Sequence, residues 1–592
     1  MLQAILKMVY ILGISCYYHD SSAALLKDGI IVAAAEEERF TRVKHDVSFP
    51  INAIKYCLES QNITINDLDY VGFYEKPFIK FERMMMQHLT YWPKSWKLFV
   101  DTIPSWLNNK LRVMKAIKKL KYKGDVLFIE HHLAHAASSF LVSPFNEATI
   151  VTIDGVGEWT TTAIGSGSNK DIELDKEVRF PHSLGLLYSA ITAYLGFSVN
   201  NSEFKVMGMA PYGNMTKKNS YYNKLKEVIT INNDGSYALD QSYFTYCFKD
   251  RMPSQKLCDL LGGPVRVPED KVTQRHKDIA AAVQLVYEEV LFKILDYAYS
   301  LNKCDNLVIA GGCGLNSVAN GKILKNSKFK RIWIQPNSSD GGASVGVCSY
   351  IYNTILGNER NYVMNNAYLG PEFSDEEIKK FLDENDITYT TFKSDKELLE
   401  TTAKLILDNQ VVGWFQGRME WGPRALGSRS ILANPCNPNA QNLLNEKVKY
   451  REKWRPFAPV VCADDALKYF VCDNPIPEAT DFMLMVYPIK EEVRKVIPAV
   501  THVDGSGRLQ TIRREQNSLY YDLIKKFGEL GEIPILINTS FNIRGEPIVC
   551  TPYDAYRCVC GTEIDYLVMG NYLIKRDDNL EDAWDSEQYA KD

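Results

Sequence analysis

The sequence predicts an α/β protein built from two domains. A chain of 592 residues, 46% apolar and 24% charged, is globular and long enough for several hydrophobic cores. Strand-like runs alternate with turns over Val9–Phe40, and two later strand-like runs each lead through a glycine-rich turn into a helix start. Apolar periodicity is lost between Asn353 and Asn366, which indicates a linker. We therefore expect one domain over residues 1–355 and a second over residues 366–592.

In the first domain, the early strands form a meander. The strand VYILGI is followed by the polar turn SCYYHDSS, the apolar run AALL, a Lys-Asp-Gly turn and the strand IIVAAA. Further on, LVIAGGCGLN (Leu307–Asn316) and RIWIQPNSSDGGASVG (Arg331–Gly346) each run from a strand through a Gly/Ser/Asn-rich turn to small residues that can begin a helix. Backbone N–H groups at such turns can hold phosphate, because glycine permits close approach and a helix N-terminus favours an anion.

The second domain carries an unusual concentration of positive charge. After the helix pattern FSDEEIKKFLDEN and the strand VVGWFQG come GRMEWGPRALGSRSILANP and NEKVKYREKWRPFAP. Their cationic residues are Arg418, Arg424, Arg429, Lys447, Lys449, Arg451, Lys453 and Arg455, and Arg508, Ser540, Asn542 and Arg544 follow in later segments. Trp421 and Trp454 interleave with these charges, which favours a polyphosphate pocket over a solvated helix face. The run KLRVMKAIKKLKYKG (Lys110–Gly124) spreads lysines and an arginine around a helix without interleaved tryptophans, and it is predicted to be a solvated helix face.

A histidine-rich segment, IEHHLAHAAS, predicts a metal site. In a helix, His131 and His135 project from one face one turn apart, a geometry that lets two imidazoles share a metal. A zincin has its general-base glutamate directly after the first histidine, whereas His132 stands there in this chain. A metalloprotease is therefore disfavoured, and a histidine-rich core helix remains the structural alternative.

Further ligands are available where strands end. Asp154 and Asp340 each follow an apolar run and precede a glycine, although each could equally be an Asx-turn residue. Two imidazoles with two carboxylates suit iron(II), manganese or zinc, and spacing does not choose among these metals. His19 lies in the first polar turn, and a neutral imidazole there can accept a proton from an alcohol because its ordinary pKa is about 6.5.

Composition also disfavours several classes of partner. A formal net charge of -5 does not recruit nucleic acid or an anionic membrane. No stretch approaches the roughly 18 consecutive apolar residues that a membrane-spanning helix needs. Thirteen cysteines are scattered without a CxxC pair, which is typical of a reducing compartment, so we expect a cytoplasmic protein.

Ten segments together resemble the O-carbamoyltransferase family that includes NodU, CmcH and TobZ. In chain order they are GISCYYHDSSAALLKDGIIVAAAEEERFTR, EHHLAHAAS, VTIDGVGEW, FKVMGMAPYG, AGGCGLN, PNSSDGGASVG, GRMEWGPRALGSRSILA, KYREKWRPFAP, HVDGSGRLQT and NTSFNIRGEPIV. The resemblance implies an N-terminal domain of the actin-like ATPase type and a C-terminal YrdC-like domain. In that family the YrdC-like domain makes carbamoyl adenylate from carbamoyl phosphate and ATP, and the other domain transfers the carbamoyl group to an alcohol.

The resemblance also implies roles for particular residues. The metal ligands for iron(II) or a similar divalent ion would be His131, His135, Asp154 and Asp340, and His19 would serve the acceptor hydroxyl. Gly311, Gly312, Asn316, Gly341 and Gly342 would hold the adenylate. Carbamoyl phosphate and ATP, the latter with Mg²⁺, would be held by Arg418, Lys449, Arg451, Arg455, Arg508, Ser540 and Asn542, of which Lys449 and Arg508 are expected to be catalytic.

The expected partner is a small-molecule alcohol. The hydroxymethyl group of a saxitoxin-type molecule is one candidate, and residues that line the acceptor pocket are expected within Pro77–Lys123 and Pro181–Pro268. No nucleic-acid or membrane partner is expected, and a homodimer is left open. The alternatives are a tRNA threonylcarbamoyl-adenosine-type modifying enzyme, which would need a basic surface for tRNA, and a non-catalytic regulator that binds nucleotide or metal.

Overall fold

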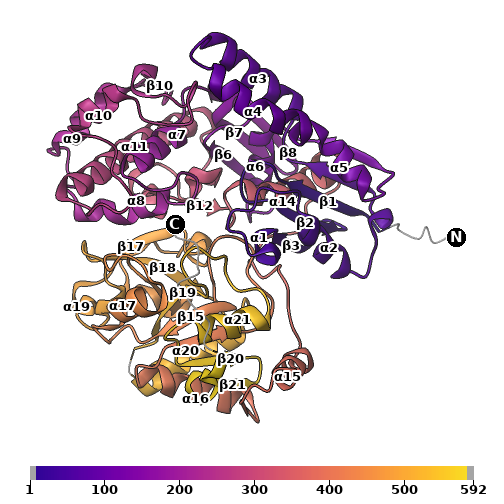
Figure 1. Cartoon of the computed structure of the whole chain (residues 1–592), viewed down its shortest axis with the longest axis vertical. Helices are drawn as coiled ribbons and strands as arrows, with labels where there is room; N and C mark the ends of the chain where they lie inside the picture. Colours follow the sequence, from indigo (N-terminus) through magenta and orange to yellow (C-terminus); the bar gives the residue numbers. More distant parts are fainter. Residues whose placement is uncertain (1–7, 532, 583–592) are drawn as a thin grey trace. The chain divides into compact units, whose positions relative to one another are not determined.

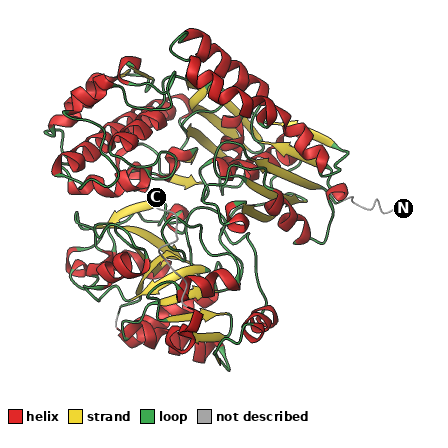
Figure 2. Ribbon diagram, in the orientation of Figure 1, coloured by secondary structure: helices red, strands yellow, loops and turns green. Residues whose placement is uncertain are grey.

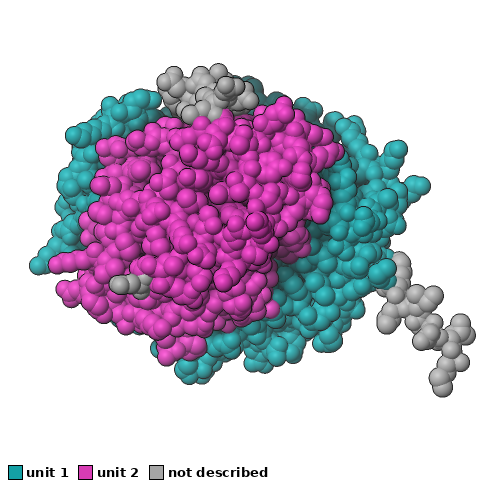
Figure 3. Space-filling model, turned by 90° about the horizontal axis from the view of Figure 1, so that it is seen from below, with its two compact units in different colours: residues 1–37, 45–316, 323–364 teal, residues 38–44, 317–322, 365–592 magenta. Residues whose placement is uncertain are grey.

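The structure, a computed structural model, describes residues 8–531 and 533–582 and divides into two compact units (Figure 3). Of the described residues, unit 1 contains 8–37, His45–Asn316 and Ile323–Met364. Unit 2 contains Glu38–Lys44, Ser317–Lys322 and the described residues from Asn365 to 582. Both units combine helices and strands, so the predicted α/β class is confirmed (Figure 2). In the described part of the chain, no helix has the length and apolar character needed to cross a bilayer.

Unit 1 is built on two five-stranded sheets with the same topology (Figure 1). The first has the order β3-β2-β1-β4-β5 and the second β12-β11-β6-β7-β8. In each sheet three consecutive strands form an antiparallel meander. A fourth strand pairs in parallel with the first strand of the meander, and a fifth pairs in parallel with the fourth. The meander predicted from Val9 is β1–β3, and the strands predicted before the two glycine-rich turns are β11 and β12.

The strands of the first sheet are β1 (Tyr10–Ser15), β2 (Ser22–Lys27), β3 (Ile30–Glu36), β4 (Tyr70–Phe73) and β5 (Asp125–Phe128). Those of the second are β6 (Glu147–Ile153), β7 (Thr160–Ser168), β8 (Asp171–Arg179), β11 (Asn306–Ala310) and β12 (Arg331–Ile334). Strand β1 is buried along its whole length and β6 along all but its first residue, as expected for strands covered on both faces.

Two helices, α6 (His131–Phe140) and α14 (Ala343–Ser349), pack against each other in unit 1 (Figure 1). Their backbones approach closely at Gly346, where a Cβ atom would lie 1.9 Å from the carbonyl oxygen of Ala134. Only glycine allows this approach. The short 3-10 turn Asp340–Gly342 directly precedes α14, so the crossing of the two helices holds Asp340 next to the histidines of α6.

Replacing Gly346 with alanine is expected to lower the free energy of unfolding by about 2 kcal/mol. The clash with the Ala134 carbonyl and the Ser138 N–H involves backbone atoms that cannot rotate away, and it outweighs the roughly 1 kcal/mol that alanine gains in a helix. Chemical denaturation measures this loss. An unchanged stability would show that the two helices are free to separate.

Unit 2 is built on a nine-stranded sheet of order β13-β21-β20-β14-β15-β19-β16-β18-β17. Its strands are β13 (Thr390–Thr391), β14 (Val412–Phe415), β15 (Arg429–Ala433), β16 (Ala458–Cys462), β17 (Met485–Pro488), β18 (Ser506–Ile512), β19 (Ile535–Ser540), β20 (Tyr566–Met569) and β21 (Tyr572–Lys575). Helices α16 (Asp395–Leu407) and α20 (Ser518–Gly531) contribute Ile406, Leu523 and Phe527 to a core with Trp414 and Val460 of the sheet. The predicted helix near Ser374 is α15 (Asp375–Glu384), which begins with a Ser374 capping box.

Two short segments that precede the main part of unit 2 in the sequence, Glu38–Lys44 and Ser317–Lys322, also belong to unit 2. The first contains α1 (Glu38–Thr41), and the Arg42 guanidinium that follows it donates to the carbonyl oxygens of Pro547 and Ile548 at 2.8 and 2.7 Å. The second contains α12 (Ser317–Asn320), whose Asn320 amide donates to the Leu484 carbonyl at 3.0 Å. Both segments are therefore fastened to unit 2 by side-chain hydrogen bonds to its backbone.

Candidate functional site

Helix α6 presents His131 and His135 to one buried point in unit 1. The helix begins directly after Glu130, and the Glu158 carboxylate accepts hydrogen bonds from the His131 N–H at 3.1 and 3.2 Å, as an acid at a helix N-terminus does. The two imidazoles are fully buried, and their Nε2 atoms lie 3.1 Å apart. The predicted spacing of one helical turn therefore brings both rings together.

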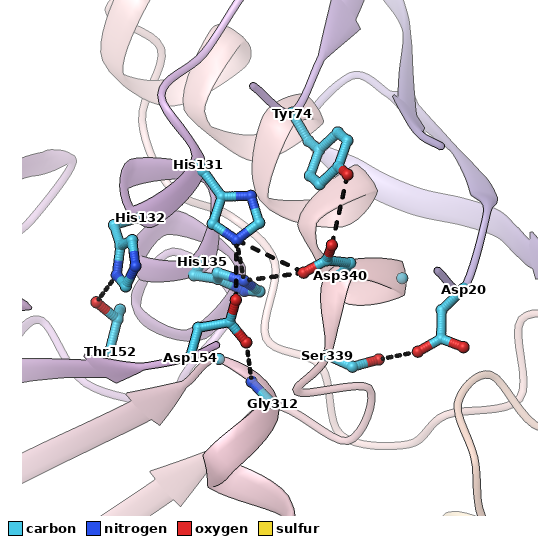
Figure 4. Close-up of polar contacts among 12 residues, drawn as sticks. Asp20, Tyr74, His131, His132, His135, Thr152, Asp154, Gly312, Ser339 and Asp340 are labelled. Carbon is cyan, nitrogen blue, oxygen red and sulfur yellow. Dashed lines mark hydrogen bonds and ion pairs between the residues drawn. The ribbon is translucent and has the colours of Figure 1, made fainter. Parts of the chain in front are cut away.

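Two aspartates, one at the end of β6 and one in the turn before α14, complete the cluster (Figure 4). Asp154 follows β6, and its Oδ2 lies 3.3 Å from Nε2 of His131. Asp340 follows β12, and its Oδ1 lies 3.5 Å from Nε2 of both histidines. One ligand atom from each of the four residues falls within 4.8 Å of the others. The structure thus brings together all four residues predicted to hold a metal.

Neighbouring groups orient the two carboxylates. The backbone N–H of Gly312 donates to Oδ1 of Asp154 at 2.9 Å, and the Tyr74 hydroxyl donates to Oδ2 of Asp340 at 3.4 Å (Figure 4). Burial raises the pKa of Asp154, but the hydrogen bond from His131 and the neighbouring imidazoles hold that pKa well below its usual range. Burial likewise acts to raise the pKa of Asp340, but the charges of His19 and His131 lower it, so both sites favour the carboxylate form.

The donor set fits a divalent cation. Within the described residues, Oδ1 of Asp340 is buried and has no hydrogen-bond donor, although it faces both imidazoles. Buried carboxylates of this kind are normally paired or bound to a metal. Two imidazole nitrogens and two carboxylate oxygens suit iron(II), manganese or zinc.

His132, the remaining histidine of the segment, points away from the cluster. Its Nδ1 lies 2.7 Å from the Thr152 hydroxyl (Figure 4). Burial, and to a smaller extent the neighbouring imidazoles, lower its pKa to about 3, so the ring is neutral. His132 is a packed core histidine.

His19 lies beside this cluster in the β1–β2 turn. Its Nδ1 lies 2.9 Å from Asp20, and its Nε2 lies 4.0 Å from Oδ2 of Asp340. Asp20 is held in turn by the His45 ring at 2.6 Å and by the Ser339 hydroxyl at 2.9 Å (Figure 4). Burial lowers the pKa of His19, whereas the charges of Asp340 and Asp20 raise it to about 10. The imidazole is thus oriented by one carboxylate and faces the cluster with its other nitrogen.

The glycine-rich turns lie at the edge of the same cluster. Gly311 has a positive φ of 91°, and a Cβ there would lie 2.3 Å from the Ile153 carbonyl oxygen. Gly341 and Gly342 form the 3-10 turn that begins with Asp340. The Asn316 amide exchanges two hydrogen bonds of 3.1 Å with Gln284 of α11 (Gln274–Asn302). Nucleotide binding by these five residues stays a prediction.

In unit 2, Lys449 joins Ser540 and Asn542 in one hydrogen-bonded group. The Lys449 ammonium contacts the Ser540 carbonyl and donates to the Asn542 carbonyl and side-chain oxygens at 2.9 and 2.8 Å. The Ser540 hydroxyl donates to Oδ1 of Asn542 at 2.7 Å. Burial and the charge of Arg451 lower the pKa of Lys449 well below its usual range. Three predicted residues are therefore in direct contact.

Four arginines of unit 2, Arg424, Arg451, Arg455 and Arg508, influence one another electrostatically. Burial and the charges of Arg424 and Arg455 lower the pKa of Arg508, and burial and the charge of Arg455 lower those of Arg451 and Arg424. Among the described residues, the buried Nε atoms of Arg424 and Arg508 have no hydrogen-bond partner. Arg455 lies 3.9 Å from Glu452. Guanidinium groups that repel one another are stabilised by anionic oxygens, which a phosphate supplies.

Two other arginines of this region contact backbone carbonyls. Arg429 is fully buried, donates to the carbonyls of Gln416, Gly417, Ser428 and Pro371, and stacks 3.6 Å from the centre of the Phe415 ring. Arg418 donates to the Leu369 and Gly370 carbonyls. Sequence alone does not distinguish Arg418 and Arg429 from Arg424, because one segment carries all three at similar spacing.

Unit 1 thus contains a buried His/Asp group that suits a divalent cation, and unit 2 contains arginines that suit an anionic ligand. Two family models match the chain, the Carbamoyltransferase N-terminus over residues 10–348 and the Carbamoyltransferase C-terminus over residues 403–576. The chain therefore belongs to the carbamoyltransferase family.

Relatives support this membership along nearly the whole chain. An uncharacterized protein of Synechocystis sp. is 45% identical over 96% of this chain and 97% of its own length. Nodulation protein NolNO of Sinorhizobium fredii is 34% identical over 96% of this chain and 80% of its own length. Among solved structures, T. kodakarensis HypF is 12% identical with a TM-score of 0.31 over 59% of this chain and 48% of that chain. So weak a structural likeness carries no argument.

Proposed function

We propose that the protein is an ATP-dependent O-carbamoyltransferase that acts on a hydroxyl of a small molecule. The observation that carries this proposal is the buried His131, His135, Asp154 and Asp340 cluster with His19 beside it, in a chain of the carbamoyltransferase family. The repeated sheet topology of unit 1 supports an actin-like ATPase type of domain, and we assign unit 2 as YrdC-like by resemblance.

In unit 2, the clustered arginines would bind carbamoyl phosphate and ATP. A carbamoyl group is a poor electrophile because its nitrogen donates electrons into the carbonyl, so it needs a good leaving group. Water cleaves carbamoyl phosphate to carbamate and phosphate. A carbamate oxygen then bonds to the α-phosphorus of ATP, pyrophosphate leaves, and the carbamoyl group is joined to AMP. Arg424, Arg451, Arg455 and Arg508 would stabilise the negative charge on the phosphate groups.

In unit 1, the carbamoyl group would pass to the acceptor. The hydroxyl oxygen bonds to the carbamoyl carbon, the bond to AMP breaks, and the hydroxyl proton goes to Nε2 of His19, which Asp20 orients through Nδ1. When bound by the four ligands, a divalent cation such as iron(II) supplies Lewis acidity and offsets the Asp340 charge that raises the pKa of His19.

The test is to incubate the protein with carbamoyl phosphate, ATP and a panel of alcohols, and to measure product masses. A sugar panel and a saxitoxin-type hydroxymethyl compound cover the expected acceptors. We expect one acceptor to gain a carbamoyl group only when both carbamoyl phosphate and ATP are present. Transfer without ATP would contradict the adenylate route, and pyrophosphate release without transfer to any alcohol would favour a regulator.

A further inference from the structure

Arg83 of α3 (Pro77–Thr90) is a buried arginine without an acceptor. Its side chain is only 8% exposed, yet it makes no hydrogen bond or ion pair with any residue that the structure describes, and its Nε is fully enclosed. Its guanidinium lies 4.7 Å from the centre of the Phe180 ring. Burial lowers the pKa of Arg83, and the more distant carboxylates of Glu75 and Glu158 oppose this effect. A buried guanidinium without oxygen partners is costly unless a ligand completes it.

Further positive charge lies near Arg83. Lys80 is buried one turn earlier and is neutralised by an ion pair with Glu75. Lys110 is half-buried and has no ion pair with a described residue. Burial, and then the charges of Lys80 and Arg83, lower the pKa of Lys110 to about 8. This region of unit 1 therefore holds two cations that no described carboxylate pairs.

Arg266 shows what a structural arginine looks like in the same unit. It is 7% exposed and lies 4.9 Å from the centre of the Phe197 ring, so its burial and stacking match those of Arg83. Unlike Arg83, it donates to the carbonyl oxygens of Leu195, Val267, Pro268 and Asp270. This contrast indicates that Arg83, unlike Arg266, does not stabilise the fold through hydrogen bonds to the backbone.

Tyr18 contacts both Lys80, which lies one turn before Arg83, and His19, which lies beside the His/Asp cluster. The Lys80 ammonium lies 5.0 Å from the centre of the Tyr18 ring, and that ring lies 4.7 Å from His19. Burial and the charges of Asp154 and Asp340 raise the pKa of Tyr18, whereas those of Lys80 and Arg83 lower it. Tyr18 is therefore influenced by the anionic cluster and by the cationic group together.

We propose that Arg83, assisted by Lys110, binds an oxyanion on the alcohol acceptor, namely a carboxylate, sulfate or phosphate group, while the acceptor hydroxyl faces His19. This inference rests on the proposed function for the identity of the bound molecule. The planar guanidinium pairs with two oxygens of such a group, and Phe180 covers one face of the guanidinium. The acceptor is then an acidic alcohol.

The first test uses stability, which does not depend on catalysis. Arg83→Met should raise the melting temperature by about 1–3 °C, because it removes a buried unpaired charge, while the matched Arg266→Met should lower it. Added inorganic sulfate should raise the melting temperature of the native protein more than that of Arg83→Met. Destabilisation by Arg83→Met, or an identical response to sulfate in both proteins, would overturn an oxyanion site at Arg83.

The second test distinguishes the acceptor from the donor. With glucuronate against glucose, and glycerol 3-phosphate against glycerol, the native protein should bind or carbamoylate the acidic member of each pair at least about 10-fold better. Arg83→Met should remove that preference and Arg83→Lys restore part of it, with the KM values of carbamoyl phosphate and ATP unchanged. A raised donor KM would assign Arg83 to the phosphate of the intermediate instead. Calorimetric binding of these probes is measured without ATP, so absent turnover would count against the proposed function alone.

Discussion

His131→Ala is expected to reduce carbamoyl transfer to the alcohol by at least about 10³-fold and to remove the bound metal. His131 lies within 3.5 Å of Asp154, Asp340 and His135, so its loss removes the central member of the four ligands. Pyrophosphate release that depends on ATP and carbamoyl phosphate should continue, because the residues that we propose for that reaction belong to unit 2. Metal analysis and parallel assays of the two half-reactions measure these outcomes.

The matched control is His132→Gln on the same helix. His132 is also buried, but its ring contacts Thr152 instead of the cluster, so this variant should keep its metal and most of its transfer activity. Circular dichroism establishes that both variants fold. If pyrophosphate release disappeared in folded His131→Ala protein, the assignment of two separate sites would be wrong.

Arg508→Ala is expected to lower the rate of pyrophosphate release by about 10²–10³-fold. Arg508 is a half-buried cation of the arginine group in unit 2, and the described residues offer its buried Nε no partner, so its charge is available to phosphate oxygens. Added carbamoyl adenylate should restore transfer to the alcohol in this variant, since the metal cluster is unchanged.

Arg513→Ala provides the control for the same strand. Arg513 follows β18 directly and is already paired with Asp481 at 3.1 Å, so its removal should leave pyrophosphate release near the native rate. Failure of carbamoyl adenylate to rescue a folded Arg508→Ala protein would count against a division of labour between the two units.

The elements whose hydrophobic pattern is periodic were predictable from the sequence. The β1–β3 meander, the strands β11, β12 and β14 and the capped helix α15 all lie where turns and capping residues indicate. The four metal-ligand candidates also followed from local patterns, because strand ends and a helical turn place side chains predictably. The shared topology of the two sheets in unit 1 could not be predicted in this way, because the order of strands in a sheet does not depend on a local pattern of side chains.

Residues that act through distant contacts were not predictable. Tyr74 and Glu158 contact residues of the His/Asp cluster only because strands and helices that are far apart in the chain meet there. Lys110 belongs to a run predicted to be a solvated face, yet it is half-buried beside other cations. Arg83 has no motif around it, and only the absence of an acceptor among the described residues distinguishes it from Arg266.

The two short segments that belong to unit 2 determine how members of this family can be recombined. The chain passes between the units at five peptide bonds, after Glu37, Lys44, Asn316, Lys322 and Met364. In a chimera joined only near Met364, Glu38–Lys44 and Ser317–Lys322 would come from one relative and the rest of unit 2 from another. Arg42 and Asn320 would then have to donate to the backbone of a different protein. Exchanging unit 2 between relatives therefore requires three grafts, because its residues occupy three separate stretches of the chain.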